Sequence, residues 1–304
     1  MKYKFCMICD KFFLPNLLVL IERLKNQNIY ILCLDDYTYE YLDKKKFKKK
    51  VYLYKKKEIE EHYLLNNKNK NPYFVFLLKV IFIHYIFDNI LKKNNFIIYL
   101  DSDICFFSPV KKLISYLDKK YSIFLTPHNF SKKIESNIKY GKFNAGFIAF
   151  KKDIFSEKAL IWWMKSCIKN CTIDLSRNLV GDQYYLNSFP GKFKKLYIFN
   201  NLGINCAPWN VEKDKISYKK NKFFVGKNDL VFFHFQGLRR IIYSFYYTNF
   251  SAYKVVPIPE LKRLYSMYIN KIDRKRRILE KFNHKFNFKI AVKALSYNDY
   301  ILAK

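Results

Sequence analysis

Two apolar-rich runs near the start of the chain enclose an amphipathic stretch. Residues 2–9 and 29–34 are rich in Ile, Tyr, Phe and Cys, the pattern of buried strands. Residues 15–27 place apolar side chains at helical spacing, and Pro15 occupies a first-turn position that a helix tolerates. The order strand, helix, strand predicts an α/β fold with a parallel sheet and helical crossovers.

The same criteria predict the elements that follow. Strands are predicted over 96–100, 121–128, 141–150, 195–200 and 229–237, and helices over 72–91 and 156–171. Residues 73–87 form the most hydrophobic window, but a helix needs about 20 apolar residues to cross a bilayer. We therefore predict a buried helix there, with membrane contact as the alternative.

The character of the chain changes after Pro257 and Pro259. Residues 260–304 hold 12 Lys and Arg against 4 Asp and Glu, and they are densest in RKRR at 274–277. We predict a core over residues 1–255 and a basic helical extension over 256–304. Such a segment could touch an anionic membrane surface, and a solvated helical face is the alternative.

The whole chain is strongly basic, with 57 Lys and Arg against 25 Asp and Glu and a formal charge of +32. This balance favours a polyanionic partner, such as nucleic acid, an anionic membrane or a phosphate-bearing substrate. The alternative is compositional drift on solvated faces, because Lys, Asn, Ile, Tyr and Phe are abundant together. The total charge therefore does not choose between these classes.

The cysteines and the N-terminus bear on the compartment. The seven cysteines form neither the paired CxxC spacing of a zinc site nor a disulfide framework, so we expect reduced, mostly buried thiols. The N-terminus lacks the cleavage site of a secretory signal. We expect a cytoplasmic protein, with peripheral contact to the inner face of the membrane as a further option.

The most informative short segment is Asp101-Ser102-Asp103, which follows the apolar strand 96–100. Two carboxylates this close repel each other and are costly to bury without a cation between them. Mg²⁺ and Mn²⁺ prefer such oxygen ligands. Ligands of parallel sheets bind outside the carboxyl ends of strands, where Asp10, Asp35 and His234 are also predicted. The pattern indicates a divalent cation that carries a diphosphate.

Five segments in order resemble one group of enzymes. Residues 97–110 (IIYLDSDICFFSPV) are similar to the metal-binding segment of glycosyltransferases with the GT-A fold. The resemblance is closest to family 8 glycosyltransferases and to bacterial nucleotide-diphospho-sugar transferases of surface-polysaccharide clusters. The other matching segments are 140–150, 181–187, 203–210 and 232–238. The resemblance implies a Rossmann-like mixed sheet flanked by helices, Mn²⁺ or Mg²⁺, and a nucleotide-sugar donor, most often UDP-linked.

The resemblance and the local chemistry together assign roles to individual residues. The expected metal ligands are Asp101, Asp103 and His234. The expected donor contacts are Asp10, Lys79, Asp101, Asn144, Gly146, Gly237 and Arg239, with Arg240 as an alternative to Arg239. The expected catalytic residues, beside the anomeric carbon, are Asp182 and Gln183, and the expected acceptor contacts are Trp209 and Asn210. For Lys79, Trp209 and His234 the alternative is a structural role in the core.

The segment that holds Gln183 departs from the pattern of the resembled families. Their third residue in Asp-Gln-Asp is an acid, whereas this chain has Tyr184, and Arg239 and Arg240 replace the family 8 Lys-Pro-Trp. These differences leave the sugar and the stereochemistry open. The resemblance to family 8 implies retaining transfer. Because an amide is a poor nucleophile, we predict that the acceptor then attacks on the leaving-group face while the Gln183 amide stabilises the oxocarbenium-like state.

The sequence thus predicts a metal-dependent glycosyltransferase that transfers a sugar to a glycan or lipid-linked acceptor in surface polysaccharide synthesis. One alternative is a degenerate transferase that acts as a membrane-associated scaffold. A nucleic-acid-binding protein is the other alternative, because basic and aromatic residues are both abundant. It lacks support from any helix-turn-helix, zinc-finger or RNP-like segment, so we expect no nucleic-acid partner.

Overall fold

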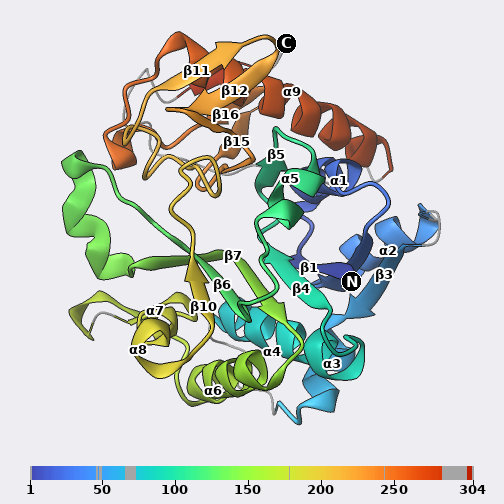
Figure 1. The fold of residues 1–304 in the computed structure, drawn as a ribbon. Coiled ribbons are helices and arrows are strands. Elements are labelled where there is room, and N and C mark those ends of the chain that lie inside the picture. Colours follow the sequence, from blue (N-terminus) through green and yellow to red (C-terminus); the bar gives the residue numbers. More distant parts are fainter. Residues whose placement is uncertain are drawn as a thin grey trace.

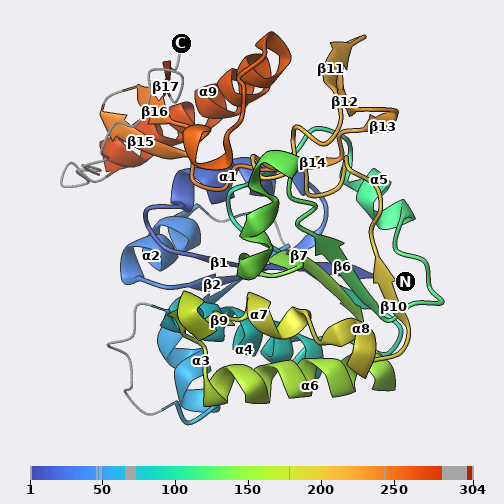
Figure 2. The same ribbon diagram turned by 90° about the vertical axis from the view of Figure 1, so that its left-hand side faces the viewer.

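The computed structural model describes residues 2–45, 47, 50–65, 73–177, 179–242, 244–282 and 300–302. In this part of the chain a central sheet lies between two layers of helices (Figures 1 and 2). A third group consists of several short strands and one long helix near the end of the described chain. The α/β class and the mixed sheet that the sequence predicts are confirmed.

The central sheet has the order β10-β6-β7-β4-β1-β2-β3. Its strands are β1 (Tyr3–Cys9), β2 (Asn28–Cys33), β3 (Val51–Lys55), β4 (Phe96–Leu100), β6 (Ile123–Pro127), β7 (Phe143–Lys151) and β10 (Leu196–Ile198). Strands β4, β1, β2 and β3 are mutually parallel, whereas β7 runs antiparallel to both β4 and β6. The parallel part brings the carboxyl ends of β1 and β4 to the same edge, where binding sites of such sheets form.

Helices cover both faces of this sheet (Figure 2). One face packs against α1 (Leu14–Arg23), α2 (Asp36–Lys44) and α5 (Val110–Ser115), and the other against α3 (Lys56–His62), α4 (Phe74–Asn89), α6 (Ile154–Lys169), α7 (Gln183–Leu186) and α8 (Phe189–Lys192). Alternate residues of β1 and β4 enter the two cores, as the two-residue period of a strand requires.

Helix α4 is the buried helix that the sequence predicts. Its apolar side chains fill the core between the sheet and α6, and Lys79 is buried among them. Within the described residues, no helix combines the length and the apolar character that a membrane span requires.

The third group joins segments that are far apart in sequence. It contains β5 (Ile104–Phe106), β11 (Ile216–Lys219), β12 (Lys222–Val225), β13 (Asn228–Asp229), β14 (Phe232–His234), β15 (Arg239–Ile242), β16 (Phe245–Tyr247), β17 (Tyr300–Leu302) and α9 (Pro259–Phe282). The short pair of β8 (Ile173–Asp174) and β9 (Leu179–Val180) lies apart from this group, beside α7. Tyr265 and Tyr268 of α9 are buried against Phe235, directly after β14. The core is therefore continuous across the expected boundary at 255/256.

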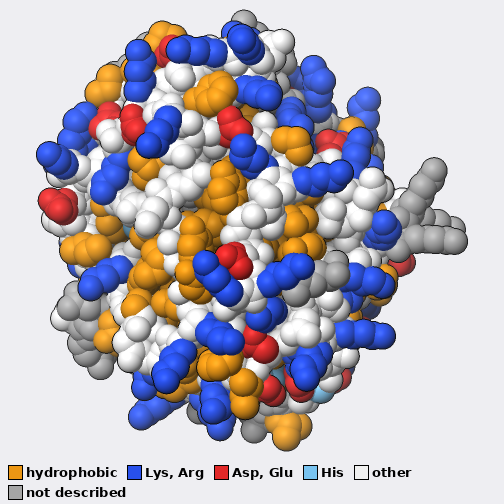
Figure 3. All heavy atoms as spheres, in the orientation of Figure 1, with side chains coloured by type: hydrophobic (Ala, Val, Ile, Leu, Met, Phe, Trp, Pro, Cys, Tyr) orange, Lys and Arg blue, Asp and Glu red, His pale blue; other side chains and the backbone are white. Residues whose placement is uncertain are grey.

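The basic segment of α9 is largely paired within the protein. Asp273 is buried and binds Arg276 at 2.7 Å and Arg277 at 2.8 Å, and Glu280 binds Arg240 at 3.0 Å. On the face seen in Figure 3, Lys and Arg side chains are spread around a central group of hydrophobic side chains. The rest of the predicted basic extension, residues 283–299 and 303–304, lies outside the described residues.

Candidate active site

A cleft of about 710 Å³ opens at the carboxyl ends of β1 and β4. This volume lies within the usual range of small-molecule sites, roughly 300–1,000 Å³. The predicted site residues that line it are Asp10, Lys79, Asp101, Asp103, Asn144, Gly146, Asp182, Gln183, Trp209, His234, Gly237 and Arg239. Asn210 is the predicted site residue that does not line the described cleft.

Asp101, Asp103 and His234 form a cluster on one wall of the cleft. The antiparallel pairing of β14 with β5 places His234 opposite Ile104, directly after the two acids. The His234 Nε2 atom lies 3.1 Å from Asp103 Oδ1 and 3.8 Å from Asp101 Oδ2. One ligand atom from each residue lies within 4.8 Å of the other two. The pairing of a short late strand thus completes a cluster whose acids come from the sheet.

The electrostatics of His234 reflect the two carboxylates. Its burial would lower the pKa, but the negative charges of Asp103 and Asp101 outweigh this effect and raise the pKa above its ordinary value. A positive charge is therefore favoured at the point where the three side chains meet. A divalent cation satisfies the same requirement with neutral His234 as a nitrogen ligand.

Gly146 of β7 forms the floor beneath the cluster. A Cβ atom at this position would lie 2.4 Å from His234 Cε1 and 2.8 Å from both Asp101 Oδ2 and Asn144 Oδ1. Only the absence of a side chain lets the strand pass this close to the ligands. Two carboxylates, an imidazole and a bare backbone beneath them fit Mg²⁺ or Mn²⁺, which accept oxygen and nitrogen ligands.

Hydrogen bonds hold the acidic turn in place. The buried Tyr99 hydroxyl donates to Asp101 Oδ1 at 2.7 Å, and the Asp101 N–H donates to the Gly146 carbonyl at 2.8 Å. Ser102 Oγ donates to the Ile8 carbonyl of β1 at 2.8 Å. These contacts fix both acids relative to the sheet, and Tyr99 leaves the second oxygen of Asp101 for the cluster.

Lys79 and Asp182 form a buried ion pair at 2.7 Å in the same cleft. Burial opposes the charge of Lys79, but the carboxylates of Asp182 and Asp101 raise its pKa, so the lysine stays charged. The Trp163 indole N–H donates to the Asp182 carbonyl at 2.8 Å. The pair joins two residues that the sequence predicts separately.

Gln183 has both ends of its amide engaged by the protein. Its Oε1 accepts from the Ala145 N–H at 3.1 Å and from Asn144 Nδ2 at 3.3 Å, and its Nε2 donates to the Tyr140 carbonyl at 2.7 Å. Asn144 Oδ1 in turn accepts from the Gly146 N–H at 3.0 Å and from Asn205 Nδ2 at 3.0 Å. This network fixes the orientation of both amides along the cleft wall.

Of the two predicted acceptor contacts in one loop, Trp209 lines the described cleft and Asn210 does not. Asn210 Oδ1 accepts from the Ala207 N–H at 2.9 Å, and its Nδ2 donates to the His128 carbonyl at 2.9 Å. Its position gives no support to the predicted acceptor contact, and its amide stabilises the loop. Trp209 lines the cleft and packs edge-on to His234 at 5.1 Å between ring centroids.

The other end of the cleft is formed by loops after β1 and β14. Asp10 Oδ1 accepts from the Phe12 and Phe13 N–H groups at 2.9 and 3.1 Å, so this acid also orders the turn that precedes helix α1. Gly237 has a left-handed φ of 82°, which favours glycine there. Arg239 lines the cleft and is exposed, whereas Arg240 pairs with Glu280.

The cleft residues that were not predicted include Tyr99, His128, Phe130 and Tyr253. Tyr99 lies inside the segment that carries the acidic pair, so its position alone could have identified it. His128 and Phe130 follow a predicted strand in an ordinary turn, and Tyr253 stands far from any recognisable segment. Only the folded chain brings these three rings beside Trp209.

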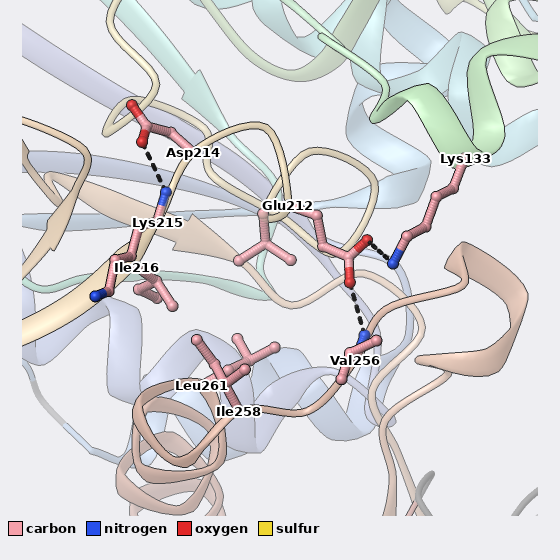
Figure 4. Close-up of a pocket in the computed structure, with 9 residues that line it drawn as sticks. Lys133, Glu212, Asp214, Lys215, Ile216, Val256, Ile258 and Leu261 are labelled. Carbon is pink, nitrogen blue, oxygen red and sulfur yellow. Dashed lines mark hydrogen bonds and ion pairs between the residues drawn. The ribbon is translucent and has the colours of Figure 1, made fainter.

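A second hollow of about 460 Å³ lies outside the cleft and shares no described lining residue with it. The Glu212 carboxylate there accepts from the Val256 N–H at 2.8 Å and pairs with Lys133 of η1 (Lys132–Tyr140) at 2.8 Å (Figure 4). Ile258 and other apolar side chains line it. Through these two contacts, Glu212 joins η1 to the segment before α9.

Comparisons with known proteins give distant relatives. No family model matches the chain. Two uncharacterised proteins of Bacillus subtilis strain 168 are similar in sequence. YfnD is 28% identical over 182 residues, which are 59% of this chain and 58% of YfnD. YfnF is 28% identical over 126 residues, 41% of this chain and 37% of YfnF. The chain thus spans less than two thirds of the length of either relative.

Three solved structures are similar to the chain at low sequence identity, and the first of them supports a shared fold. Mouse xyloside xylosyltransferase 1 in its apo form has a TM-score of 0.51 and 13% identity, over 78% of this chain and 98% of that chain. The galactosyltransferase LgtC in complex with donor and acceptor sugar analogues has a TM-score of 0.46 and 13% identity, over 77% and 87%. The bifunctional glycosyltransferase WbbM in its apo form has a TM-score of 0.47 and 12% identity, over 69% and 41%.

Proposed function

This chain has the GT-A fold of nucleotide-sugar transferases, and we propose that it is a metal-dependent glycosyltransferase with a UDP-sugar donor. The observation that carries the proposal is the cluster of Asp101, Asp103 and His234 in a cleft at the carboxyl ends of parallel strands. A diphosphate leaving group and paired carboxylates need a cation between them.

The cluster residues are the proposed ligands of Mn²⁺ or Mg²⁺. When bound, the ion would neutralise the negative charge that develops on the leaving diphosphate. Asp10, at the end of β1, is placed for the nucleoside, and the exposed Arg239 for the diphosphate. Gly237 allows the chain to turn back over the cleft before Arg239.

Lys79 and Asp182 are the proposed contacts of the donor sugar. A buried pair offers both a donor and an acceptor to sugar hydroxyls, and neither charge is exposed to bulk water. Asn144 fixes the same wall through its bonds to Gly146 and Gln183. Because both ends of the Gln183 amide already bind protein groups, we assign Gln183 to shaping the wall around the anomeric carbon.

We propose that transfer retains the anomeric configuration, as the resemblance to family 8 implies. The acceptor oxygen then attacks on the face that the diphosphate leaves. The C1–O bond to phosphate breaks, the C1–O bond to the acceptor forms, and the acceptor proton passes to the diphosphate. An NMR spectrum of the product tests this directly, and an inverted anomeric centre would contradict it.

The proposed acceptor is a glycan or a lipid-linked sugar in surface polysaccharide synthesis, on the cytoplasmic side. The ring of Trp209 is suited to pack on a sugar face. We do not propose membrane contact through residues 260–304. Within the described part of that segment, Asp273 binds two of the arginines that would have to meet lipid.

Calorimetry tests the proposed donor and metal together. We expect UDP to bind with Mn²⁺ and to bind at least tenfold more weakly without it, while GDP and CMP bind more weakly under both conditions. Asp103→Ala should abolish the effect of Mn²⁺, whereas Asp118→Ala, at an exposed surface acid, should not change it. If no nucleotide binds with or without metal, the proposal is wrong, and the scaffold alternative gains support.

A further inference from the structure

Four aromatic rings form a box next to His234 of the proposed metal site. His128 stacks on Phe130 at 4.7 Å and meets the edge of Trp209 at 5.3 Å between ring centroids. Tyr253 packs edge-on to Trp209 at 6.3 Å. All four rings line the cleft, and Trp209 joins the box to His234 at 5.1 Å.

The tautomer of His128 follows from its hydrogen bonds. Its Nδ1 lies 2.8 Å from the Gly141 carbonyl, which can only accept, so Nδ1 carries a proton. Burial keeps the ring neutral, so Nε2 carries a lone pair. The contact that the described residues give to Nε2 is the Asn144 amide at 3.4 Å, a long and weak bond. His128 can therefore accept a stronger hydrogen bond from a ligand.

Trp209 offers the complementary group. Its indole Nε1 is buried and has no hydrogen-bond partner among the described residues. Indole can only donate, and an unsatisfied buried donor costs roughly 1–3 kcal/mol. Because Trp209 lines the cleft, its unpartnered N–H suggests a ligand oxygen as the missing acceptor.

The charges around the box select for an uncharged ligand. Among the described residues that line the cleft, Lys79 and Arg239 are the cations, and Lys79 is already bound to Asp182. A carboxylate or phosphate in the box would meet the lone pair of His128, and none of the four box residues is a cation.

We propose that this box, His128, Phe130, Trp209 and Tyr253, is the acceptor subsite and takes an uncharged sugar ring. The rings contact its C–H faces, one hydroxyl donates to His128 Nε2, and a neighbouring oxygen accepts from Trp209 Nε1. His128 is a positioning residue for the acceptor hydroxyl and takes no proton from it. This inference rests on the proposed glycosyltransferase function.

The test compares wild type with His128→Phe, which keeps a stacking ring but removes the lone pair, and with His128→Gln, which restores an acceptor atom near Nε2. His84→Phe is the matched control, because His84 bonds Tyr63 outside the cleft lining. The acceptors are octyl β-glucoside, octyl β-galactoside and octyl N-acetyl-β-glucosaminide, with octyl β-glucuronide as the anionic counterpart. UDP-glucose, UDP-galactose and UDP-N-acetylglucosamine serve as donors, with Mn²⁺ for kinetics and Mg²⁺ for saturation-transfer NMR.

The expected result is binding and transfer to at least one neutral glycoside and none to the glucuronide. His128→Phe should raise the acceptor KM by about 3–10-fold, the loss of one hydrogen bond, and leave the donor KM unchanged. His128→Gln should recover most of this loss, and His84→Phe should behave as wild type.

Three results would overturn the inference. Preference for the glucuronide would exclude an uncharged acceptor. An unchanged acceptor KM in His128→Phe would exclude the hydrogen bond. Failure of every neutral glycoside to bind to protein that binds UDP and metal would exclude the box as a sugar site while the donor half of the proposed function stands. Failure to bind UDP at all would refute the proposed function itself, and this inference with it.

Discussion

Gly146→Ala is the most direct perturbation of the proposed metal site, because it adds one methyl group beneath the cluster. The added Cβ would lie 2.4 Å from His234 Cε1 and 2.8 Å from Asp101 Oδ2. The backbone at Gly146 does not have the left-handed φ that would penalise alanine, so the effect arises from space alone.

The magnitude follows from these distances. Non-bonded carbons rest about 3.5–4.0 Å apart, so His234 or β7 must move by roughly 1 Å. His234 cannot move freely, because Trp209 packs on its ring. Its backbone N–H also donates to the Cys206 carbonyl at 2.8 Å. Overpacking of this kind costs about 1–3 kcal/mol of folding stability. Because both displaced groups are proposed ligands, we expect Mn²⁺ affinity to fall by about 10–100-fold.

The assay is Mn²⁺ titration by electron paramagnetic resonance, together with urea unfolding. Gly191→Ala is the matched control, because no atom lies within 4 Å of a Cβ at this position of helix α8. Alanine should there stabilise the helix by about 0.5–1 kcal/mol and leave Mn²⁺ binding unchanged. Wild-type Mn²⁺ affinity in Gly146→Ala would show that the three side chains do not form the ion site as described.

Three further variants test the surroundings of the cluster. Tyr99→Phe removes the bond to Asp101 Oδ1, and Mn²⁺ affinity measured by the same titration should fall about tenfold. Lys79→Met leaves the buried Asp182 carboxylate uncompensated, and urea unfolding should show a loss of about 3–5 kcal/mol. Burial lowers the pKa of His128 to about 3, so the unfolded chain takes up a proton as the pH falls below 6.5 and stability is lost. His128→Phe should therefore flatten the decline of the unfolding free energy with acidity, by up to about 1.4 kcal/mol per pH unit below 6.5.

Two of these variants, Tyr99→Phe and Lys79→Met, have a matched control in the chain. Tyr265→Phe removes a buried hydroxyl that has no described partner, so it should leave Mn²⁺ binding unchanged. Lys57→Met breaks an exposed pair with Glu61 and should change stability by less than about 1 kcal/mol. A loss in Lys79→Met no larger than in Lys57→Met would mean that the buried pair is not needed. Equal pH slopes for wild type and His128→Phe would show that His128 titrates normally.

The fold was largely predictable because its periodicities are local. The strand–helix–strand opening, the buried helix α4 and the strand before Asp101 each follow from runs of apolar residues. The antiparallel direction of β7 could not be predicted, because a fully buried strand reads the same in either direction. The place of α9 was also hidden, since its buried tyrosines pack on Phe235 far away in sequence.

Some residues of the candidate site could likewise be predicted from the sequence, and others could not. Asp101 and Asp103 were visible because they follow an apolar strand within residues 97–110, a segment that resembles a known metal-binding segment. The pairing of Lys79 with Asp182 was not visible, because it depends on the distance between α4 and the start of α7. The sequence did not indicate His128 either, because its proposed role depends on its tautomer, which the Gly141 carbonyl fixes. Residues that act through a partner distant in sequence need the structure.

The charge of the cleft is opposite to the charge of the chain, and this contrast supports the proposed metal site. Lys and Arg outnumber Asp and Glu by 57 to 25 overall, yet the described cleft lining has Asp10, Asp101, Asp103 and Asp182 against Lys79 and Arg239. Two like charges 4 Å apart repel by about 1 kcal/mol in water and by about 4 kcal/mol near a protein surface. A diphosphate that approached these acids alone would therefore be repelled, however basic the rest of the surface is. An ion held by Asp101, Asp103 and His234 reverses the sign at that one point, so nucleotide affinity should depend on the ion rather than on the surface lysines.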